Sequence, residues 1–153
     1  MAIENSELTI SRFIDASPAK VWTAWSDAEH FAKWWIPAPI ECKLDLRPEG
    51  AFETQMREGG GEFSPHVEGC FLDMAPEQRL VFTTALAEGW RPIEPWLALT
   101  AIMTFETEGR GTRYSARVMH KNTGDSRKHE EMGFYEGWGT TIDQLAAFVE
   151  RLK

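Results

Sequence analysis

The stretch DSRKHEEMGFYEGWGTTIDQLAAFVERLK, residues 125–153, decides the fold predicted for this chain. It contains no proline, and its apolar residues recur at helical spacing. Trp138, Ile142, Leu145 and Val149 are separated by four, three and four positions, which places them on one stripe of an α-helix. A helix of this kind is not stable alone in water, so its stripe must pack against another element. The stretch therefore predicts one long helix held on a partner surface.

Most of the sequence before this helix is typical of β-strands. Alternating or β-rich runs between turn residues predict seven strands, at residues 8–14, 40–47, 51–57, 64–74, 80–86, 97–107 and 113–119. Residues 59–61 form a glycine run typical of a hairpin tip, and residues 88–95 are expected to form a loop. Two short helices should follow the first strand. Ser17 and Pro18 begin one of them, and the other spans residues 28–35 before Pro37 and Pro39.

This order predicts an α+β fold in which a curved antiparallel sheet grips the long helix. Short connections make consecutive strands antiparallel neighbours, and the helices are segregated from the strands along the chain. Such an arrangement tends to leave a cavity between sheet and helix. Three glycines, Gly133, Gly137 and Gly139, lie inside the predicted helix. They indicate a kink, open space beside the cavity, or a close approach of the sheet. Close packing against a strand or loop is expected above all at Gly137, beside the large Trp138.

Length and charge narrow the classes of function. A chain of 153 residues fits a single domain over residues 1–153. The net charge of -8 and the lack of a Lys/Arg cluster argue against nucleic acid and anionic membrane surfaces as partners. The sequence contains no run of about 18 apolar residues, so membrane insertion is not expected. The N-terminal sequence MAIENSELTI lacks the features of a signal peptide, so a cytoplasmic protein is expected.

Aromatic residues supply the main evidence for a binding site. They make up 12% of the chain and include 7 tryptophans, a residue that often lines pockets. Aromatic and Met side chains suit an apolar or aromatic ligand, because Met adapts its shape. The same residues would equally fill a solid core without a void. The candidate ligand-binding residues are Trp34, Trp35, Met56, Phe82, Trp90, Trp96, Met103, Met132, Tyr135 and Trp138.

Few residues suggest chemistry beyond binding. At helical spacing, His129 and Glu136 flank the apolar stripe, so they are the candidate acid–base residues at a cavity mouth. The alternative is a solvated helix flank, since charged residues surround them. The sequence contains neither a metal-ligand motif nor a phosphate-binding loop, so no metal and no cofactor are expected.

Five segments together resemble a known family: FIDASPAKVWTAW (residues 13–25), FAKWWIP (31–37), GCFLDMAPEQRLVFT (69–83), FETEGRGTRY (105–114) and MGFYEGWGTTIDQL (132–145). In order and spacing they are similar to the family named after the activator of the heat-shock-90 ATPase. That family belongs to the START-like, or SRPBCC, superfamily of helix-grip proteins. The resemblance implies a seven-stranded curved sheet around the C-terminal helix, with an internal cavity. The superfamily includes lipid carriers, hormone receptors and polyketide cyclases, so the fold alone does not imply one activity.

Three hypotheses about function follow. The first is a carrier or receptor that holds a small hydrophobic or aromatic molecule between the sheet and the C-terminal helix. The second is an enzyme of polyketide cyclase or hydrolase type that uses the same cavity. The third is a stress- or chaperone-related interaction module, or a homodimer, that uses an exposed apolar patch near residues 90–96.

Overall fold

The computed structural model describes residues 6–35, 40–57 and 61–152, and it has the predicted α+β architecture. The helices are α1 (Pro18–Ser26), α2 (Ala28–Trp34), a 3-10 turn η1 (Glu88–Trp90), α3 (Thr123–Glu131) and α4 (Phe134–Arg151). The strands are β1 (Glu7–Ile14), β2 (Ile40–Leu44), β3 (Ala51–Met56), β4 (Ser64–Ala75), β5 (Arg79–Thr83), β6 (Leu86–Ala87), β7 (Arg91–Pro92), β8 (Leu99–Glu108) and β9 (Gly111–His120).

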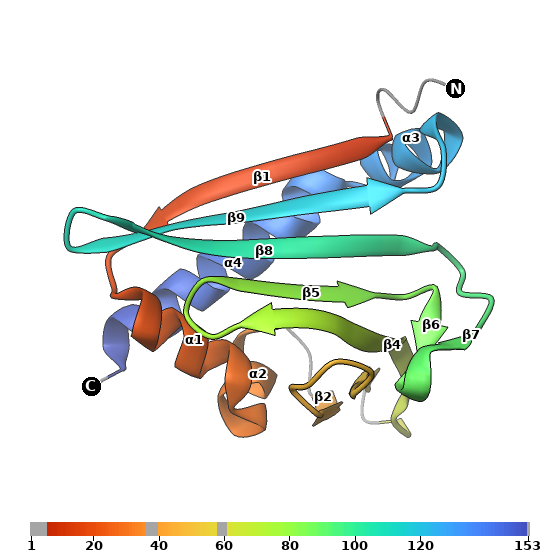
Figure 1. The fold of residues 1–153 in the computed structure, drawn as a ribbon, viewed down its shortest axis with the longest axis horizontal. Coiled ribbons are helices and arrows are strands. Elements are labelled where there is room, and N and C mark those ends of the chain that lie inside the picture. Colours follow the sequence, from red (N-terminus) through yellow and green to blue (C-terminus); the bar gives the residue numbers. More distant parts are fainter. Residues whose placement is uncertain (1–5, 36–39, 58–60, 153) are drawn as a thin grey trace.

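Seven of these strands form one antiparallel sheet, in the order β1-β9-β8-β5-β4-β3-β2 (Figure 1). Consecutive strands are neighbours except at one edge, where β1 pairs with β9 from Glu7↔Met119 to Ile14↔Thr112. The first strand thus brings the N-terminal segment beside the last strand. β6 and β7 form a separate two-stranded hairpin between β5 and β8.

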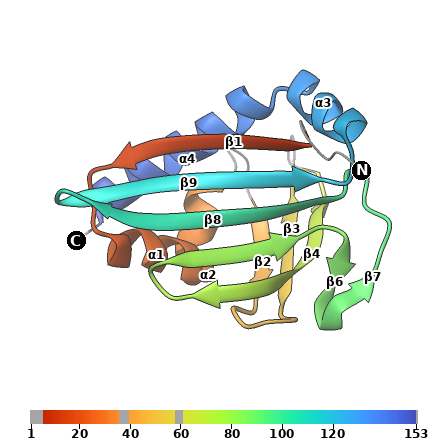
Figure 2. The same ribbon diagram turned by 45° about the horizontal axis from the view of Figure 1, so that its top comes forward.

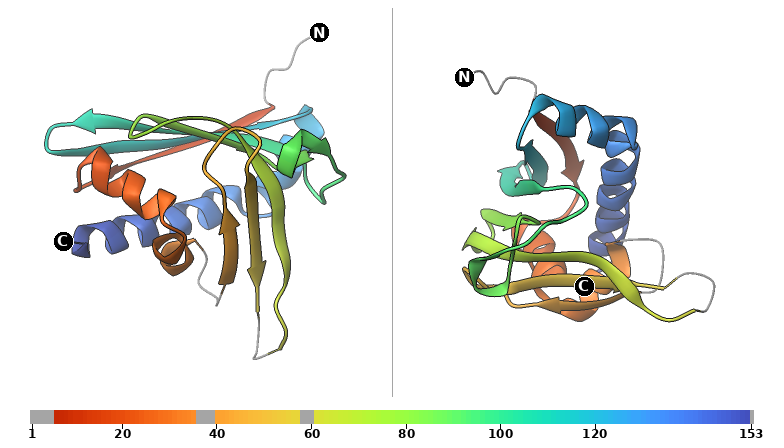
Figure 3. Two further views of the ribbon diagram at one scale, coloured as in Figure 1. Left: turned by 60° about the horizontal axis from the view of Figure 1, so that its bottom comes forward. Right: turned by 90° about the vertical axis from the view of Figure 1, so that its right-hand side faces the viewer.

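The sheet curves, and the helices occupy its concave side. In the left view of Figure 3, α1 and α4 run beneath β1, β8 and β9, while β2, β3 and β4 descend beside them. Figure 2 shows α4 running behind the strands along the length of the sheet. α4 packs against β1, α1 and α2. The sheet therefore wraps around a helical layer, as the sequence predicted.

An aromatic cluster fills one end of this concave side. The ring of Trp25 contacts those of Phe31, Trp34, Trp35, Phe52 and Phe82, with centroids between 5.1 and 6.3 Å apart. Two of the buried indoles have their nitrogens satisfied. Nε1 of Trp25 donates to the hydroxyl of Tyr114 (2.8 Å), and Nε1 of Trp34 donates to the carbonyl of Ala24 (2.9 Å). Satisfied polar atoms let large aromatics be buried at little cost.

The apolar stripe of α4 is buried as predicted. Ile142, Leu145 and Val149 are fully buried, while Trp138 is half-buried. α4 also caps the carboxyl end of α2. Thr141 Oγ1 donates to the carbonyl of Trp35 (3.2 Å), and Gln144 Nε2 donates to that of Trp34 (2.7 Å). These contacts satisfy carbonyls that a helix end leaves free, and they fix α2 relative to α4.

The predicted long C-terminal helix is present as α4, but it does not begin at residue 125, because the chain breaks at Gly133. Gly133 has φ of 97°, a left-handed conformation that ends α3 and begins α4. Its N–H bonds the carbonyl of Glu130, and its carbonyl accepts from Gly137. Only glycine adopts this conformation at low cost, so the kink alternative applies at this position. α3 then packs against β1 and β9.

The close approach expected at Gly137 is also misplaced. A Cβ at Gly137 would meet no atom within 4 Å, whereas one at Gly139 would lie 3.1 Å from Arg12 Nη2 and 3.6 Å from Ile10 Cδ1. Gly139 is buried against β1, while Gly137 is exposed. The glycine that lies against the strand is therefore Gly139, two residues after the expected Gly137.

The remaining predictions of strands and turns are mostly accurate. β2 ends at Leu44 rather than residue 47, and the strand predicted over residues 80–86 is divided between β5 and β6. The loop predicted at 88–95 contains η1 and β7. Ser17 and Asp27 cap α1 and α2 by accepting backbone N–H groups. Pro37, Pro39 and most of the predicted glycine tip lie outside the described residues.

Two alanine substitutions should have opposite effects on stability. Gly137→Ala is expected to raise the free energy of unfolding by about 0.5–1 kcal/mol, because alanine favours a helix interior and the space is open. Gly133→Ala is expected to lower it by about 1–2 kcal/mol, because alanine is strained at positive φ. Urea unfolding of both variants tests this. Equal effects of the two changes would contradict the break at Gly133.

Candidate functional site

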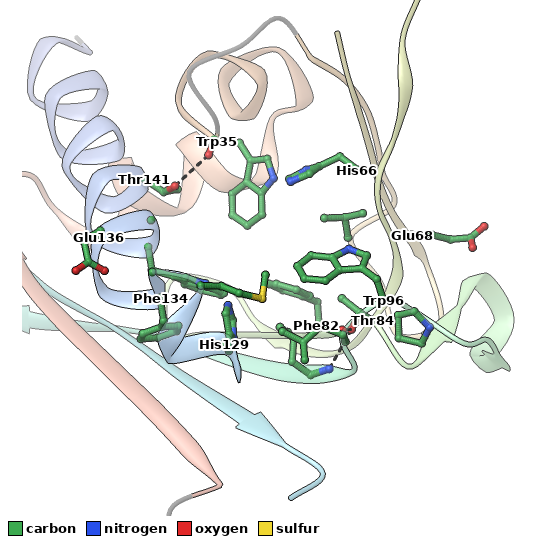
Figure 4. A pocket seen from close by; sticks show the side chains of 18 of the residues that line it. Trp35, His66, Glu68, Phe82, Thr84, Trp96, His129, Phe134, Glu136 and Thr141 are labelled. Atoms are coloured by element: carbon green, nitrogen blue, oxygen red, sulfur yellow. Dashed lines mark hydrogen bonds between the residues drawn. The ribbon is translucent and has the colours of Figure 1, made fainter. Parts of the chain in front are cut away.

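A pocket lies at the end of the concave side that the aromatic cluster leaves open. It encloses about 870 Å³ between the N-terminal half of α4, the end of α3, the sheet strands β4, β5 and β8, and the loop of residues 93–97. Pockets of this size accommodate small molecules. Figure 4 shows side chains from these elements converging on one space. The interior of the protein is thus not solidly filled.

The walls are mainly apolar and aromatic. Trp35, Phe82 and Leu99 line the sheet and α2 side, and Phe134 and Trp138 line the α4 side. Thr84 anchors the loop, because its Oγ1 donates to the carbonyl of Leu97 (2.8 Å) and accepts from the N–H of Leu99 (3.0 Å). This loop carries Trp96, which is 64% exposed and lines the pocket. An exposed tryptophan at the rim of an apolar hollow is available to cover a ligand.

Trp35 contributes a polar atom without a partner. The residue is only 9% exposed, and its Nε1–H is buried with no hydrogen-bond partner among the described residues. In Figure 4 the indole nitrogen is turned toward the imidazole of His66. An unsatisfied buried donor costs about 1–3 kcal/mol, so it calls for an explanation. A ligand atom that accepts a hydrogen bond would remove that cost.

His66 is the first of two imidazoles that line the pocket. Its Nδ1 lies 3.0 Å from Oγ1 of Thr54, a fully buried residue on β3. Burial lowers the pKa of His66, because an imidazolium is poorly solvated there. Sequence analysis did not single out His66. Its position at the start of a strand carried no sign that it would face a cavity.

His129 is the second imidazole, and a chain of hydrogen bonds fixes its protonation pattern. His120 Nδ1 lies 3.1 Å from the carbonyl oxygen of Ser6, and His120 Nε2 lies 2.9 Å from His129 Nδ1. A carbonyl only accepts, so His120 carries its proton on Nδ1, and in the neutral ring Nε2 must accept. His129 Nδ1 therefore donates, which leaves Nε2 of neutral His129 as an unprotonated acceptor.

The surroundings of His129 keep it neutral. It is 8% exposed, and its ring contacts those of Phe134 and Trp138 at 5.1 and 6.4 Å. Burial, reinforced by His120, lowers the pKa of His129 to about 4. Within the described part of the chain, the hydrogen bond of the His129 ring is made by Nδ1 and not by Nε2. His129 thus brings a free, neutral acceptor to the wall of the pocket.

The charged groups of the lining are all acidic. Glu68, Glu94 and Glu136 belong to the lining, and each is exposed. Figure 4 shows the carboxylates of Glu68 and Glu136 turned away from the middle of the pocket. Neither lysine nor arginine is found among the described lining residues. Within the part of the chain that the structure describes, the pocket therefore has no charged group turned toward its middle, and its rim is negatively charged.

The structure brings part of the predicted ligand-binding set together. Five of those residues line the pocket: Trp35, Phe82, Trp96, Met132 and Trp138. Trp34 and Met103 are instead buried in the hydrophobic core. Met56, Trp90 and Tyr135 lie away from the lining, and the last two are 47% and 44% exposed. Trp34 and Trp35 both pack on Trp25 and Phe31, but only Trp35 also lines the pocket. That any of these residues contacts a ligand stays a prediction.

The two acid–base candidates have different environments. His129 is buried in the wall, so the expectation of a solvated helix flank is wrong for this residue. Glu136 lies at the rim and is exposed. His129 is on α3 and Glu136 on α4, so the break at Gly133 separates residues that were expected on one helix face.

No cluster of three or more His, Cys, Asp or Glu side chains suited to a metal ion occurs within residues 6–35, 40–57 and 61–152. In the same ranges, none of the helices combines the length and apolar character needed to cross a membrane.

A curved antiparallel sheet that grips a C-terminal helix beside a pocket defines the helix-grip class, also called START-like or SRPBCC. Residues 15–150 match the family described as "Activator of Hsp90 ATPase homolog 1-like protein". The chain belongs to this family, which confirms the resemblance drawn from the sequence.

Solved structures of bacterial proteins share this fold. Protein NE0264 from Nitrosomonas europaea is 37% identical, with a TM-score of 0.90 over 100% of this chain and 99% of that one. Protein Ms6760 from Mycobacterium smegmatis is 22% identical, with a TM-score of 0.78 over 99% and 95%. A protein from Arthrobacter aurescens is 22% identical, with a TM-score of 0.80 over 98% and 89%. No curated protein matches the sequence significantly.

The buried His129 should make the protein less stable in acid. The folded-state pKa of about 4 lies below the ordinary value of 6.5, so the unfolded chain binds more protons between these pH values. The stability present above pH 6.5 is therefore lost as the pH falls toward 4, by up to about 3 kcal/mol. Urea unfolding at pH 7.5 and 4.5 should show a smaller loss for His129→Phe than for the wild type. Identical losses would contradict a neutral, buried His129.

Proposed function

We propose that this protein binds a small, predominantly apolar or aromatic molecule in the pocket between the sheet and α4. The observation that carries the proposal is the unpartnered Nε1–H of Trp35 in the wall of an apolar cavity of about 870 Å³. A protein that only needed a stable core would gain by filling this volume and satisfying this donor. A ligand with an acceptor atom accounts for both features.

The size and lining of the pocket support binding by burial of apolar surface. Phe82, Phe134 and Trp138 offer flat aromatic faces, and Met132 adds a flexible side chain at the rim. Aromatic pairs contribute about 0.5–1.5 kcal/mol beyond the burial of area. The exposed apolar residues Trp96 and Met132 lie at the pocket, where a covering role for the ligand explains their exposure better than a separate protein interface does.

The alternative of a polyketide cyclase or hydrolase would make His129 a general base. A base acts best when its pKa lies near the working pH. With a pKa of about 4, His129 is a weak base at neutral pH, although it remains a good hydrogen-bond acceptor. The exposed Glu136 belongs to a different helix and turns away from the pocket. These features favour binding over proton abstraction.

A neutral fluorescent naphthyl ketone, Prodan, provides a direct test. Its ring system suits the aromatic walls, and its carbonyl can accept from Trp35 Nε1–H. We expect saturable binding with a blue-shifted emission, because the dye leaves water. Trp138→Ala should weaken binding about tenfold by removing an aromatic wall. Trp35→Phe should weaken it about fivefold by removing the donor while keeping an aromatic ring.

The matched control is Trp90→Ala, since Trp90 is exposed and lies outside the lining. Its affinity for Prodan should equal that of the wild type. Circular dichroism would establish that each variant is folded. If Prodan does not bind, or if Trp90→Ala weakens binding as much as Trp138→Ala does, the proposed pocket is not the binding site.

A further inference from the structure

The proposed binding function leaves open what chemical class of molecule the pocket selects. Two features of the wall answer this independently of Trp35: the fixed acceptor on His129 and the charges of the lining. From these we infer that the ligand is an uncharged, hydroxyl-bearing aromatic molecule whose hydroxyl donates to Nε2 of His129. This inference rests on the proposed function, because it assumes that the same pocket is occupied.

The hydrogen-bond chain from Ser6 through His120 to His129, here called the relay, makes Nε2 of His129 an acceptor rather than a donor. A free histidine exchanges its proton between two nitrogens and serves either role. Here the carbonyl of Ser6 holds the proton of His120 on Nδ1, and His120 Nε2 in turn holds that of His129 on Nδ1. Both imidazoles are buried, so water does not compete for these bonds. His120 is therefore a positioning residue that acts through His129.

A fixed acceptor set among aromatic side chains selects for a donor. An aromatic hydroxyl loses its hydrogen bonds to water on entering the pocket, and His129 Nε2 restores one of them. A carbonyl or an ether oxygen placed there would meet an unprotonated nitrogen and gain nothing. In Figure 4, His129 and Trp35 stand on opposite sides of the pocket, so the donor Trp35 is available to a second, accepting atom of the same molecule.

The charges of the lining exclude anions. A carboxylate or phosphate in the pocket would find no lysine or arginine among the described lining residues. It would also pass the acidic rim of Glu68, Glu94 and Glu136. Burying an unpaired anion is costly, and the unprotonated Nε2 offers it no hydrogen bond. The pocket is thus poorly suited to fatty acids and to other free acids, despite its apolar walls.

Three ligands that share one ring system test this choice: 2-naphthol, naphthalene and 2-naphthoate. Each is measured by displacement of Prodan from the wild-type protein at pH 7.5. We expect 2-naphthol to bind about five- to tenfold more tightly than naphthalene, in line with one net hydrogen bond. We expect 2-naphthoate to bind at least about tenfold more weakly than 2-naphthol.

Variants assign the preference to the relay. In His129→Phe the preference for 2-naphthol should disappear or reverse, because its hydroxyl then has no acceptor, while Prodan still binds. His120→Leu frees the proton of His129 to move, so it should reduce the ratio of the two affinities. The matched control is His30→Phe, the same substitution on α2 outside the pocket lining, which should leave the ratio unchanged.

A spectroscopic measurement reports directly which nitrogen of His129 carries the proton. Long-range ¹H–¹⁵N correlation spectra should show His129 with Nδ1 protonated and Nε2 unprotonated at pH 7.5, and His120→Leu should mix the two forms. A merely structural role for His120 would leave this signal unchanged.

The outcomes separate the two proposals. Failure of Prodan to bind would overturn the binding function and this inference together. Three results would overturn the inference alone while Prodan still binds. They are equal displacement by all three compounds, tightest displacement by 2-naphthoate, and a His129 protonated on Nε2. The same applies if His66→Phe, rather than His129→Phe, removes the preference for 2-naphthol.

Discussion

The packing of α4 on the concave side of the sheet is the constraint on which the rest of the structure depends. Its buried residues Ile142, Leu145 and Val149 join the core, and burial of such side chains contributes about 1.5–3 kcal/mol each. Thr141 and Gln144 on the same helix bond the last carbonyls of α2. One helix therefore both completes the core and fixes the residue that follows α2, Trp35. A shift of α4 would move two walls of the pocket at once.

The pocket exists because the helical layer fills only part of the concave side. At one end, the rings around Trp25 occupy the space between α1, α2 and the sheet. At the other end, the left-handed Gly133 separates α3 from α4, so that α3 packs against β1 and β9 instead of extending the line of α4. That turn carries His129 to His120 and leaves the space in front of Trp138 open.

The polar atoms of the pocket are sparse and specific. Most buried polar groups of the core are paired, as Trp25 with Tyr114 and Trp34 with Ala24 illustrate. Trp35 Nε1 has no such partner, and His129 Nε2 is a free acceptor by virtue of its relay. An unsatisfied buried donor lowers stability in the protein alone, and a ligand atom that accepts from Trp35 Nε1–H would remove this cost. The family fold supplies the cavity, and in the proposal made above these two atoms would supply its selectivity.

The sequence by itself determined the architecture, because periodic spacing of apolar residues and local capping and turn residues are enough to predict helices and strands. Alternation predicted the seven strands of the sheet, capping residues such as Ser17 predicted the short helices, and the stripe ending at Val149 predicted the gripped helix. About half of the predicted ligand-binding set lines the pocket, because aromatic content indicates a core or a pocket without distinguishing them. Only the tertiary structure showed that Trp34 belongs to the core and Trp35 to the pocket wall. It also decided the break at Gly133 and the pairing of His120 with His129. Each of these depends on a backbone angle or on contacts between strands and helices that no spacing along the chain encodes.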